Sequence, residues 1–338
     1  MSARESIVPV FVPHLGCPND CVLCNQRRIS GQTVPATAAT VREAMEKAAT
    51  LPKNGGKRQL AFYGGSFTAI PATEQEALLA AAKEYMDRGE LDSLRLSTRP
   101  DAIDGEVLNR LLRYGVETVE LGAQSLDDEV LLLAGRGHTA ADVENASRQV
   151  KAAGLKLILQ MMTGLPGDTD EKDVETARKI IALKPDGVRI YPTVIVRDTA
   201  LFDLWQCGRY PEHTVEDAVR ACAKLLPMFE EAGIPVIRLG LNPTEELSCG
   251  AAAGGAYHPA LGEMVKSRIM YERARKLLEG TEPGKRITLG VGRSKVSQMT
   301  GQHRCNVEKL CADYDLKELK IKAADIEDDG IAVLCSEW

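Results

Sequence analysis

Residues 7–24 read IVPVFVPHLGCPNDCVLC, an apolar and β-branched run that leads directly into three cysteines. Four to eight apolar residues bounded by Gly, Pro or Asp are typical of a buried parallel strand. Six further runs of this kind follow, and the segments between them carry helix-capping residues. The six further predicted strands cover residues 59–63, 94–97, 116–121, 155–162, 186–193 and 234–241.

This alternation of strands and helices predicts a parallel sheet covered by helices. Seven strands fit a partial or full (β/α) barrel of the TIM type, and a doubly wound open sheet is the alternative. After residue 241 the rhythm breaks into a Gly- and Ala-rich segment, 248–257, which we expect to be a flexible loop. A helix over 258–278 and a strand over 286–292 follow. We therefore expect a barrel core of residues 1–245 and a C-terminal extension of residues 246–338 that packs on it.

The bulk composition predicts a cytoplasmic protein with a sizeable, mainly aliphatic core. The chain has 338 residues, of which 44% are hydrophobic and 4% aromatic, and its formal net charge is −6. An acidic chain has no global field that attracts polyanions, so any nucleic-acid contact needs a local basic patch. We see neither a membrane-spanning run nor a signal peptide. Nine cysteines without an export signal indicate reduced or metal-bound thiols.

Polar or Gly-rich clusters stand directly after the predicted strands. The carboxyl ends of barrel strands all point to one face, where the active sites of barrel enzymes lie. We therefore expect these clusters to converge in space, although any single one could be only a tight turn. The clusters are the three cysteines, GGSF (64–67), STRPD (97–101), GAQS (122–125), GRGHT (135–139) and QMMTGLPGDT (160–169).

The three cysteines are spaced Cys-x3-Cys-x2-Cys. Cys21 and Cys24 alone could form a thiol redox pair, but this leaves Cys17 unused. A structural zinc site needs a fourth ligand, such as His14 or Cys249. A 4Fe–4S cluster held by three thiolates leaves one iron open, and soft thiolates select iron–sulfur clusters or zinc.

This spacing directly after a first strand resembles the cluster motif of the radical SAM superfamily. The stretches FYGGSFTAI, LSTRPD, ELGAQSLDDEVL, GRGHT and MTGLPGDT resemble the radical SAM domain of the Elongator catalytic-subunit-like group, over about residues 7–280. The resemblance implies an enzyme with an oxygen-sensitive 4Fe–4S cluster that cleaves S-adenosylmethionine reductively. The resulting 5′-deoxyadenosyl radical abstracts a hydrogen atom from the substrate.

The resemblance also implies roles for individual residues. Ser66 departs from the family pattern, because many members have Glu or Thr there. Arg99 could pair with Asp101 or reach a substrate, and Tyr191 could donate a proton or simply pack. The implied metal ligands are Cys17, Cys21 and Cys24, and the implied cofactor-binding residues are Gly64, Gly65, Ser66, Ser97, Gln124, Arg136 and Gln160.

The C-terminal part bears on partners. Elongator catalytic subunits carry an acetyltransferase domain after the radical domain, and we expect nothing comparable in the remaining residues. Residues 283–309 are instead basic, which indicates either an RNA-contacting surface or a solvated loop and helix. The candidate RNA contacts are Lys285, Arg286, Arg293, Lys295 and Arg304.

Three functions follow from these observations. The first is a radical SAM enzyme that modifies an RNA base, with tRNA as partner. The second is a radical SAM enzyme that acts on a small metabolite or a peptide. The third is a non-catalytic binding protein stabilised by a metal or cluster. Both enzyme hypotheses imply a reducing electron donor of the flavodoxin or ferredoxin type.

Overall fold

The computed structural model describes residues 6–12, 21–24, 34–50, 56–241, 250–327 and 330–338. The chain divides into two compact units. One comprises Met1–Thr214 and Leu225–Tyr257, and the other comprises Val215–Lys224 and His258–Trp338. The predicted domain division at residues 245 and 246 lies outside the described residues and stays a prediction, as does the packing of the extension on the barrel.

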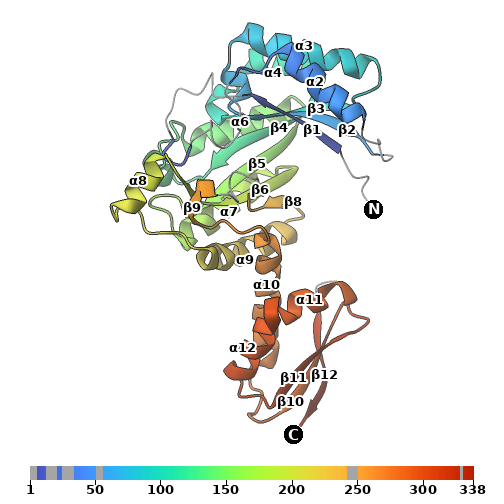
Figure 1. Cartoon of the computed structure of the whole chain (residues 1–338), viewed down its shortest axis with the longest axis vertical. Helices are drawn as coiled ribbons and strands as arrows, with labels where there is room; N and C mark the ends of the chain where they lie inside the picture. Colours follow the sequence, from blue (N-terminus) through green and yellow to red (C-terminus); the bar gives the residue numbers. More distant parts are fainter. Residues whose placement is uncertain (1–5, 13–20, 25–33, 51–55, 242–249, 328–329) are drawn as a thin grey trace. The chain divides into compact units, whose positions relative to one another are not determined.

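The first unit is built around a curled sheet of seven parallel strands, which forms a half-barrel (Figure 1). The strand order follows the order of the chain. This confirms the partial barrel; the doubly wound alternative is wrong, because in such a sheet the strand order reverses at a switch point. The strands, in sheet order, are β1 (Ser6–Val12), β2 (Arg58–Gly64), β3 (Ser93–Thr98), β4 (Val116–Gln124), β5 (Lys156–Thr163), β6 (Gly187–Pro192) and β8 (Val236–Leu239).

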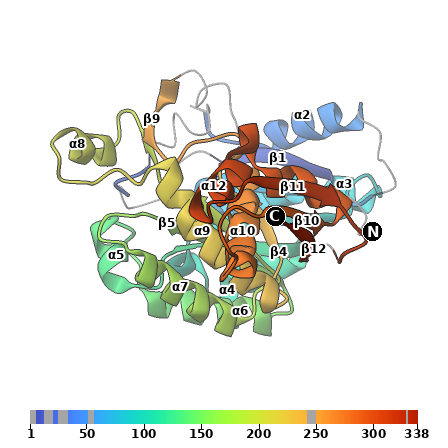
Figure 2. The same ribbon diagram turned by 90° about the horizontal axis from the view of Figure 1, so that it is seen from below.

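Helices connect successive strands and cover the outside of the sheet, as right-handed crossovers require. Figure 2 shows α4, α5, α6 and α7 along one side of the strands β4 and β5. Among the described residues, no helix is both long enough and apolar enough to cross a lipid bilayer. The helices that follow the strands are α2 (Ala38–Ala49), α3 (Ala72–Asp87), α4 (Gly105–Arg113), α5 (Asp128–Leu133), α6 (Ala140–Ala152), α7 (Asp170–Leu183), α8 (Ala200–Gln206) and α9 (Val215–Glu231).

The strands alternate between an apolar and a polar face. Leu94 and Leu96 on β3, and Val119 and Leu121 on β4, are fully buried, as expected for residues that pack under helices. The residues of opposite parity face the inside of the half-barrel, and several of them carry charge. The sequence thus forms its core on the outer face of the sheet and leaves a polar inner face for chemistry.

The predicted flexible loop over residues 248–257 is wrong in its described part. Ala252–Gly255 form strand β9, which pairs antiparallel with β7 (Val194–Val196). Gly255 has φ +80°, and a Cβ there would lie 2.8 Å from the carbonyl oxygen of Thr193. Glycine here permits a close approach of two backbones, so the Gly- and Ala-rich composition reflects tight pairing.

The second unit has its own core between one long helix and a small sheet. The predicted helix over 258–278 is present as α10 (Leu261–Leu278), and the predicted strand over 286–292 as β10. Leu289, Leu310 and Met299 are fully buried in this core. The sheet has the order β11-β10-β12 with β10 and β11 parallel. The remaining elements are β10 (Arg286–Val291), α11 (Val296–Thr300), α12 (Cys305–Asp313), β11 (Glu318–Ala323) and β12 (Ile331–Glu337).

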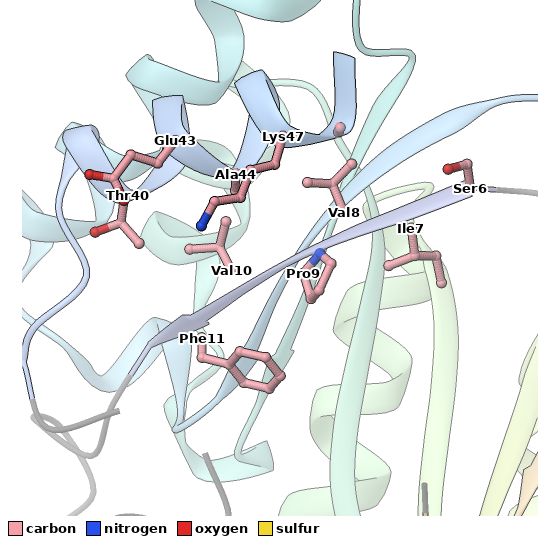
Figure 3. Close-up of a pocket in the computed structure, with 11 residues that line it drawn as sticks. Ser6, Ile7, Val8, Pro9, Val10, Phe11, Thr40, Glu43, Ala44 and Lys47 are labelled. Carbon is pink, nitrogen blue, oxygen red and sulfur yellow. The ribbon is translucent and has the colours of Figure 1, made fainter. Parts of the chain in front are cut away.

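An open groove of about 460 Å³ runs along the edge strand β1, with α2 on its other side (Figure 3). The N–H of Ser6 and the carbonyl of Val12 bond toward β2, so residues of the other parity turn their backbone groups to the open edge. Pro9 has that other parity and has no N–H to offer. A proline at such a position disfavours the addition of a further strand.

Candidate functional site

A cavity of about 380 Å³ opens at the carboxyl ends of the parallel strands. The structure brings together in its wall all seven predicted cofactor-binding residues and two of the three predicted metal ligands. Cys17 lies outside the described residues. The lining residues are Phe11, Cys21, Cys24, Tyr63, Gly64, Gly65, Ser66, Ser97, Thr98, Arg99, Glu120, Gly122, Gln124, Arg136, Gln160, Arg189 and Tyr191.

The segment from Cys21 to Cys24 is a tight turn, in which the N–H of Cys24 donates to the carbonyl of Cys21 at 2.9 Å. Val22 ties this turn to two distant elements. Its N–H donates to the carbonyl of Ala134 at 3.1 Å, and its own carbonyl accepts from the N–H of Leu201 at 2.7 Å. Val22 therefore anchors the turn, and both thiols line the cavity.

Glycines shape the wall after β2. Gly64 has φ +105°, and a Cβ there would lie 3.0 Å from the carbonyl oxygen of Val12. The N–H of Gly65 donates to that carbonyl at 2.8 Å. The hydroxyl of Ser66 bonds to Thr98 Oγ1 at 2.8 Å and accepts from the N–H of Arg99 at 3.1 Å. The Ser66 hydroxyl therefore fastens this turn to the end of β3, and the turn presents backbone groups to the cavity.

A bulge near the end of β4 positions Gln124 and opens space beside it. Gln124 has φ +65°, a conformation that non-glycine residues adopt rarely and that often marks a functional site. A Cβ on Gly122 would lie 2.9 Å from Gln124 Nε2. Arg136 donates from Nη2 to the carbonyl of Gly122 at 3.2 Å and from Nη1 to Cys21 Sγ at 3.4 Å. Arg136, one of the predicted cofactor-binding residues, thus also contacts a cysteine sulfur.

These side chains fit a thiolate-bound cluster beside an organic ligand. Gln124 Oε1 is buried and accepts no hydrogen bond from the part of the chain that the structure describes, so it is available to a ligand. Among the described residues, no group of three His, Cys, Asp or Glu side chains is placed to hold a metal ion. The two described thiols form a partial set, which the predicted third ligand Cys17 would complete.

The floor of the cavity is a buried polar network that the sequence reading missed. Glu120 is fully buried. Its carboxylate accepts from Arg95 Nη1 at 3.0 Å, from Arg189 Nη2 at 3.1 Å and from Gln160 Nε2 at 3.1 Å. The hydroxyl of Tyr63 also donates to it, at 3.2 Å. The sequence does contain a signal for this network, because its charged residues interrupt otherwise apolar strands at inward-facing positions.

Arg99 lines the cavity, and His138 lies two residues after Arg136, which lines it too. Arg99 is buried and forms a bidentate ion pair with Asp101, through Nε and Nη2 at 2.9 Å each, which is the first of its two expected roles. His138 is 5% exposed, and its Nε2–H donates to the carbonyl of Ala123 at 3.2 Å. Burial, reinforced by the charge of Arg136, lowers the pKa of His138 to about 4.

This histidine predicts an acid-sensitive fold. Between pH 6.5 and about 4 the unfolded chain binds a proton at His138 that the folded chain does not. The free energy of unfolding is therefore unaffected by this group above pH 6.5, and it decreases as the pH is lowered from 6.5 to about 4. A shift of this size corresponds to about 3 kcal/mol. Urea unfolding of wild type and His138→Gln at pH 7 and pH 4.5 measures it. We expect the wild type to lose more stability than the variant; equal losses would contradict the prediction.

The five candidate RNA contacts do not form one group in the structure. Lys285 and Arg286 lie at the start of β10, where the Lys285 ammonium stands 4.8 Å from the ring centre of Trp338. Arg293 and Lys295 follow the opposite end of this strand. A six-residue strand separates its ends by roughly 20 Å. Arg304, with φ +64°, precedes α12.

Comparison with known proteins matches most of the chain. Residues 11–180 match the radical SAM superfamily, and residues 185–271 match the radical SAM C-terminal domain. A tRNA uridine(34) acetyltransferase of Dehalococcoides mccartyi (strain CBDB1) is 28% identical over 259 residues, 66% of this chain and 56% of that protein. Elongator complex protein 3 of Homo sapiens is 26% identical over 248 residues, 68% of this chain and 44% of that protein. The chain thus spans about half the length of these relatives.

Solved structures agree on the fold. The archaeal Elp3 of Methanocaldococcus infernus has a TM-score of 0.61 at 23% identity, over 82% of this chain and 64% of that chain. SuiB of Streptococcus suis, bound to S-adenosylmethionine, has a TM-score of 0.50 at 13% identity, over 73% and 49%. Members of the matched superfamily are enzymes that bind a 4Fe–4S cluster and S-adenosylmethionine. By its sequence and its half-barrel, this chain belongs to the radical SAM superfamily.

Proposed function

We propose that this chain binds a 4Fe–4S cluster through Cys17, Cys21 and Cys24 and binds S-adenosylmethionine in the adjoining cavity. The observation that supports this most is that two cysteine thiols open into the same 380 Å³ cavity as the glycine-rich turn, Gln124 and Arg136. When bound, the two groups supply a 5′-deoxyadenosyl radical that abstracts a hydrogen atom from the substrate. Electrons would come from a flavodoxin- or ferredoxin-type donor.

Different residues of the chain suit different groups of S-adenosylmethionine. Backbone carbonyls of Gly64 and Gly65 suit the methionyl ammonium, because carbonyls accept and glycine allows close approach. The guanidinium of Arg136 suits the methionyl carboxylate while one of its N–H groups stays on Cys21. We assign Gln124, Gln160 and Ser97 to the remaining polar groups of S-adenosylmethionine, the first because its amide oxygen is buried and unpartnered among the described residues.

Anaerobic reconstitution with iron and sulfide tests this proposal directly. Reduced protein with S-adenosylmethionine should release 5′-deoxyadenosine, and bulk tRNA should acquire a mass change in one nucleoside. Release without any change in the tRNA would favour a small-molecule or peptide substrate. If the reconstituted protein showed no cluster absorbance near roughly 400 nm and released no 5′-deoxyadenosine, the proposed chemistry would be wrong.

We propose tRNA as the substrate. The support is the similarity to relatives named tRNA uridine(34) acetyltransferase, together with exposed cations in the second unit. Arg293 is exposed and lies directly after Gly292 at the end of β10. In an otherwise acidic chain, such local cations are the positions at which phosphates would be neutralised.

Replacing Arg293 and Lys295 together by alanine should weaken tRNA binding and reduce its salt dependence. Each lost phosphate contact lowers the slope of log K against log salt by about 1, so we expect a fall of about 1 to 2. Filter binding at several salt concentrations measures this slope. The variant Lys285→Ala with Arg286→Ala removes the same net charge at the other end of β10, so the two double variants together show which of these candidate positions binds phosphate. An unchanged affinity and slope in the first variant would contradict an RNA contact there.

A further inference from the structure

The polar floor of the cavity holds more hydrogen-bonding groups than the proposed cofactors use. Its centre is the fully buried carboxylate of Glu120, which lies between Arg95 and Arg189. One carboxylate between two guanidiniums leaves one net positive charge. Burying such a charged cluster costs free energy unless its hydrogen bonds are satisfied. We therefore ask which of its hydrogen-bonding groups remain available to a ligand in the cavity.

Two tyrosines complete this network, and their hydroxyl groups differ. Tyr63 accepts from Arg189 Nη2 at 3.2 Å and donates its own proton to Glu120 at 3.2 Å. Tyr191 accepts from Arg189 Nη1 at 3.4 Å. The proton of Tyr191 has no acceptor within the described part of the chain, although this side chain lines the cavity. Tyr191 is therefore the donor that the network leaves for a ligand.

The position of Tyr191 suits a contact with substrate. Arg189 and Tyr191 are two residues apart on β6, so both face the inside of the half-barrel. Arg189 pairs with Gln160 in the register of the sheet, and Tyr191 pairs with Met162, one step nearer the carboxyl end. The hydroxyl thus lies above the buried ion pair and in the same cavity as the cysteine thiols.

We propose that Tyr191 donates a hydrogen bond to a neutral carbonyl oxygen of the substrate, such as that of a pyrimidine base. The naming of a base rests on the proposed function; the donor itself rests on the geometry of the floor. Arg189 acts as the positioning residue, because its contacts with Glu120 and Tyr63 fix the guanidinium that orients the phenol.

The chemistry of the floor favours a neutral acceptor over an anion. The guanidinium of Arg189 is already in contact with Glu120, Tyr63 and Tyr191, so an anion would have to displace one of them. Burial raises the pKa of the Tyr191 phenol above its ordinary value, although the charge of Arg189 opposes this. The phenol therefore stays protonated at neutral pH and acts as a donor, which a carbonyl oxygen satisfies.

The variant Tyr191→Phe tests the proposal, because it removes one hydroxyl and keeps the ring. With reconstituted enzyme and bulk tRNA, we measure the ratio of 5′-deoxyadenosine released to nucleoside modified. We expect this ratio to rise on the order of 3- to 10-fold in the variant, because a substrate held by one hydrogen bond fewer is modified less often per cofactor cleaved. The affinity for S-adenosylmethionine should stay within about twofold. The control is Tyr85→Phe on α3, which removes the same atom from a buried tyrosine outside the cavity.

A direct binding measurement tests the proposed contact with a base without requiring turnover of tRNA. Tyr191 is replaced by 3-fluorotyrosine, and its ¹⁹F resonance is followed during titration with free uridine. A saturable shift with uridine, and none with S-adenosylmethionine alone, supports the subsite. A tenfold loss of S-adenosylmethionine affinity in Tyr191→Phe would instead make this residue a cofactor contact and overturn the proposal. An absent uridine shift also overturns it, whereas missing 5′-deoxyadenosine in the wild type refutes only the proposed function.

Discussion

Replacing Cys21 or Cys24 by alanine should abolish both the cluster absorbance and the release of 5′-deoxyadenosine. Both thiols line the cavity and are held by the Val22 hydrogen bonds, so no neighbouring described thiol can substitute for either. Loss of outer contacts at metal sites already costs 10- to 100-fold, so loss of a ligand should cost more than about 100-fold. Anaerobic reconstitution followed by chromatography of the products measures both quantities.

Cys207→Ala is the matched control for this prediction. Cys207 caps the end of α8, is exposed, and donates its S–H only locally, to the carbonyl of Leu204 at 3.4 Å. Its replacement should leave the cluster content and the product yield at the wild-type level. If all three variants behaved like the wild type, the cysteine turn would have no role in holding a cluster.

Replacing Glu120 by alanine should lower the free energy of unfolding more than any other single change at the cavity floor. The carboxylate is fully buried and forms ion pairs with Arg95 at 3.0 Å and Arg189 at 2.8 Å. Its removal leaves two guanidiniums buried without their counter-charge. Breaking a buried ion pair on one side costs about 3–5 kcal/mol, and chemical denaturation of the unloaded protein measures this.

Glu117→Ala on the same strand is the comparison. Glu117 pairs with Lys156 at 2.7 Å, but its partner is half exposed to solvent. Such pairs contribute about 0–1 kcal/mol. We therefore expect Glu120→Ala to be the more destabilising by at least about 2 kcal/mol. Equal effects of the two substitutions would mean that the floor of the cavity is hydrated and that Glu120 is not a buried counter-ion.

Much of the half-barrel could be predicted from the sequence because its signals are local. The apolar runs predicted every strand of the seven-stranded sheet within a few residues. Thr139 with Asp142 forms a capping box at the start of α6, which is also a local signal. Strand β9 was missed because its stability comes from pairing with β7, more than fifty positions away, and from close backbone approach at Gly255. The β-strand propensity of individual residues carries no information about such long-range pairing.

The candidate site also has a part that could be predicted from local sequence and a part that could not. Gly64 and Gln124, which end strands β2 and β4, could be selected because carboxyl ends converge in any parallel barrel. The floor could not, because Arg95, Glu120 and Arg189 lie within three different strands and meet only through the stagger between them. Each alone reads as a single charge in an apolar run, and register decides whether such charges pair.

The hydrogen bonds of Val22 have a consequence for biosynthesis. Val22 leaves the ribosome early, but its partners Ala134 and Leu201 are far downstream in the chain. At ordinary rates of translation, on the order of ten seconds separates the synthesis of Val22 from that of Leu201. During that interval the cysteine turn has no frame to hold it. If this turn holds a cluster as proposed, we expect iron and sulfide to be delivered only after α8 has been synthesised.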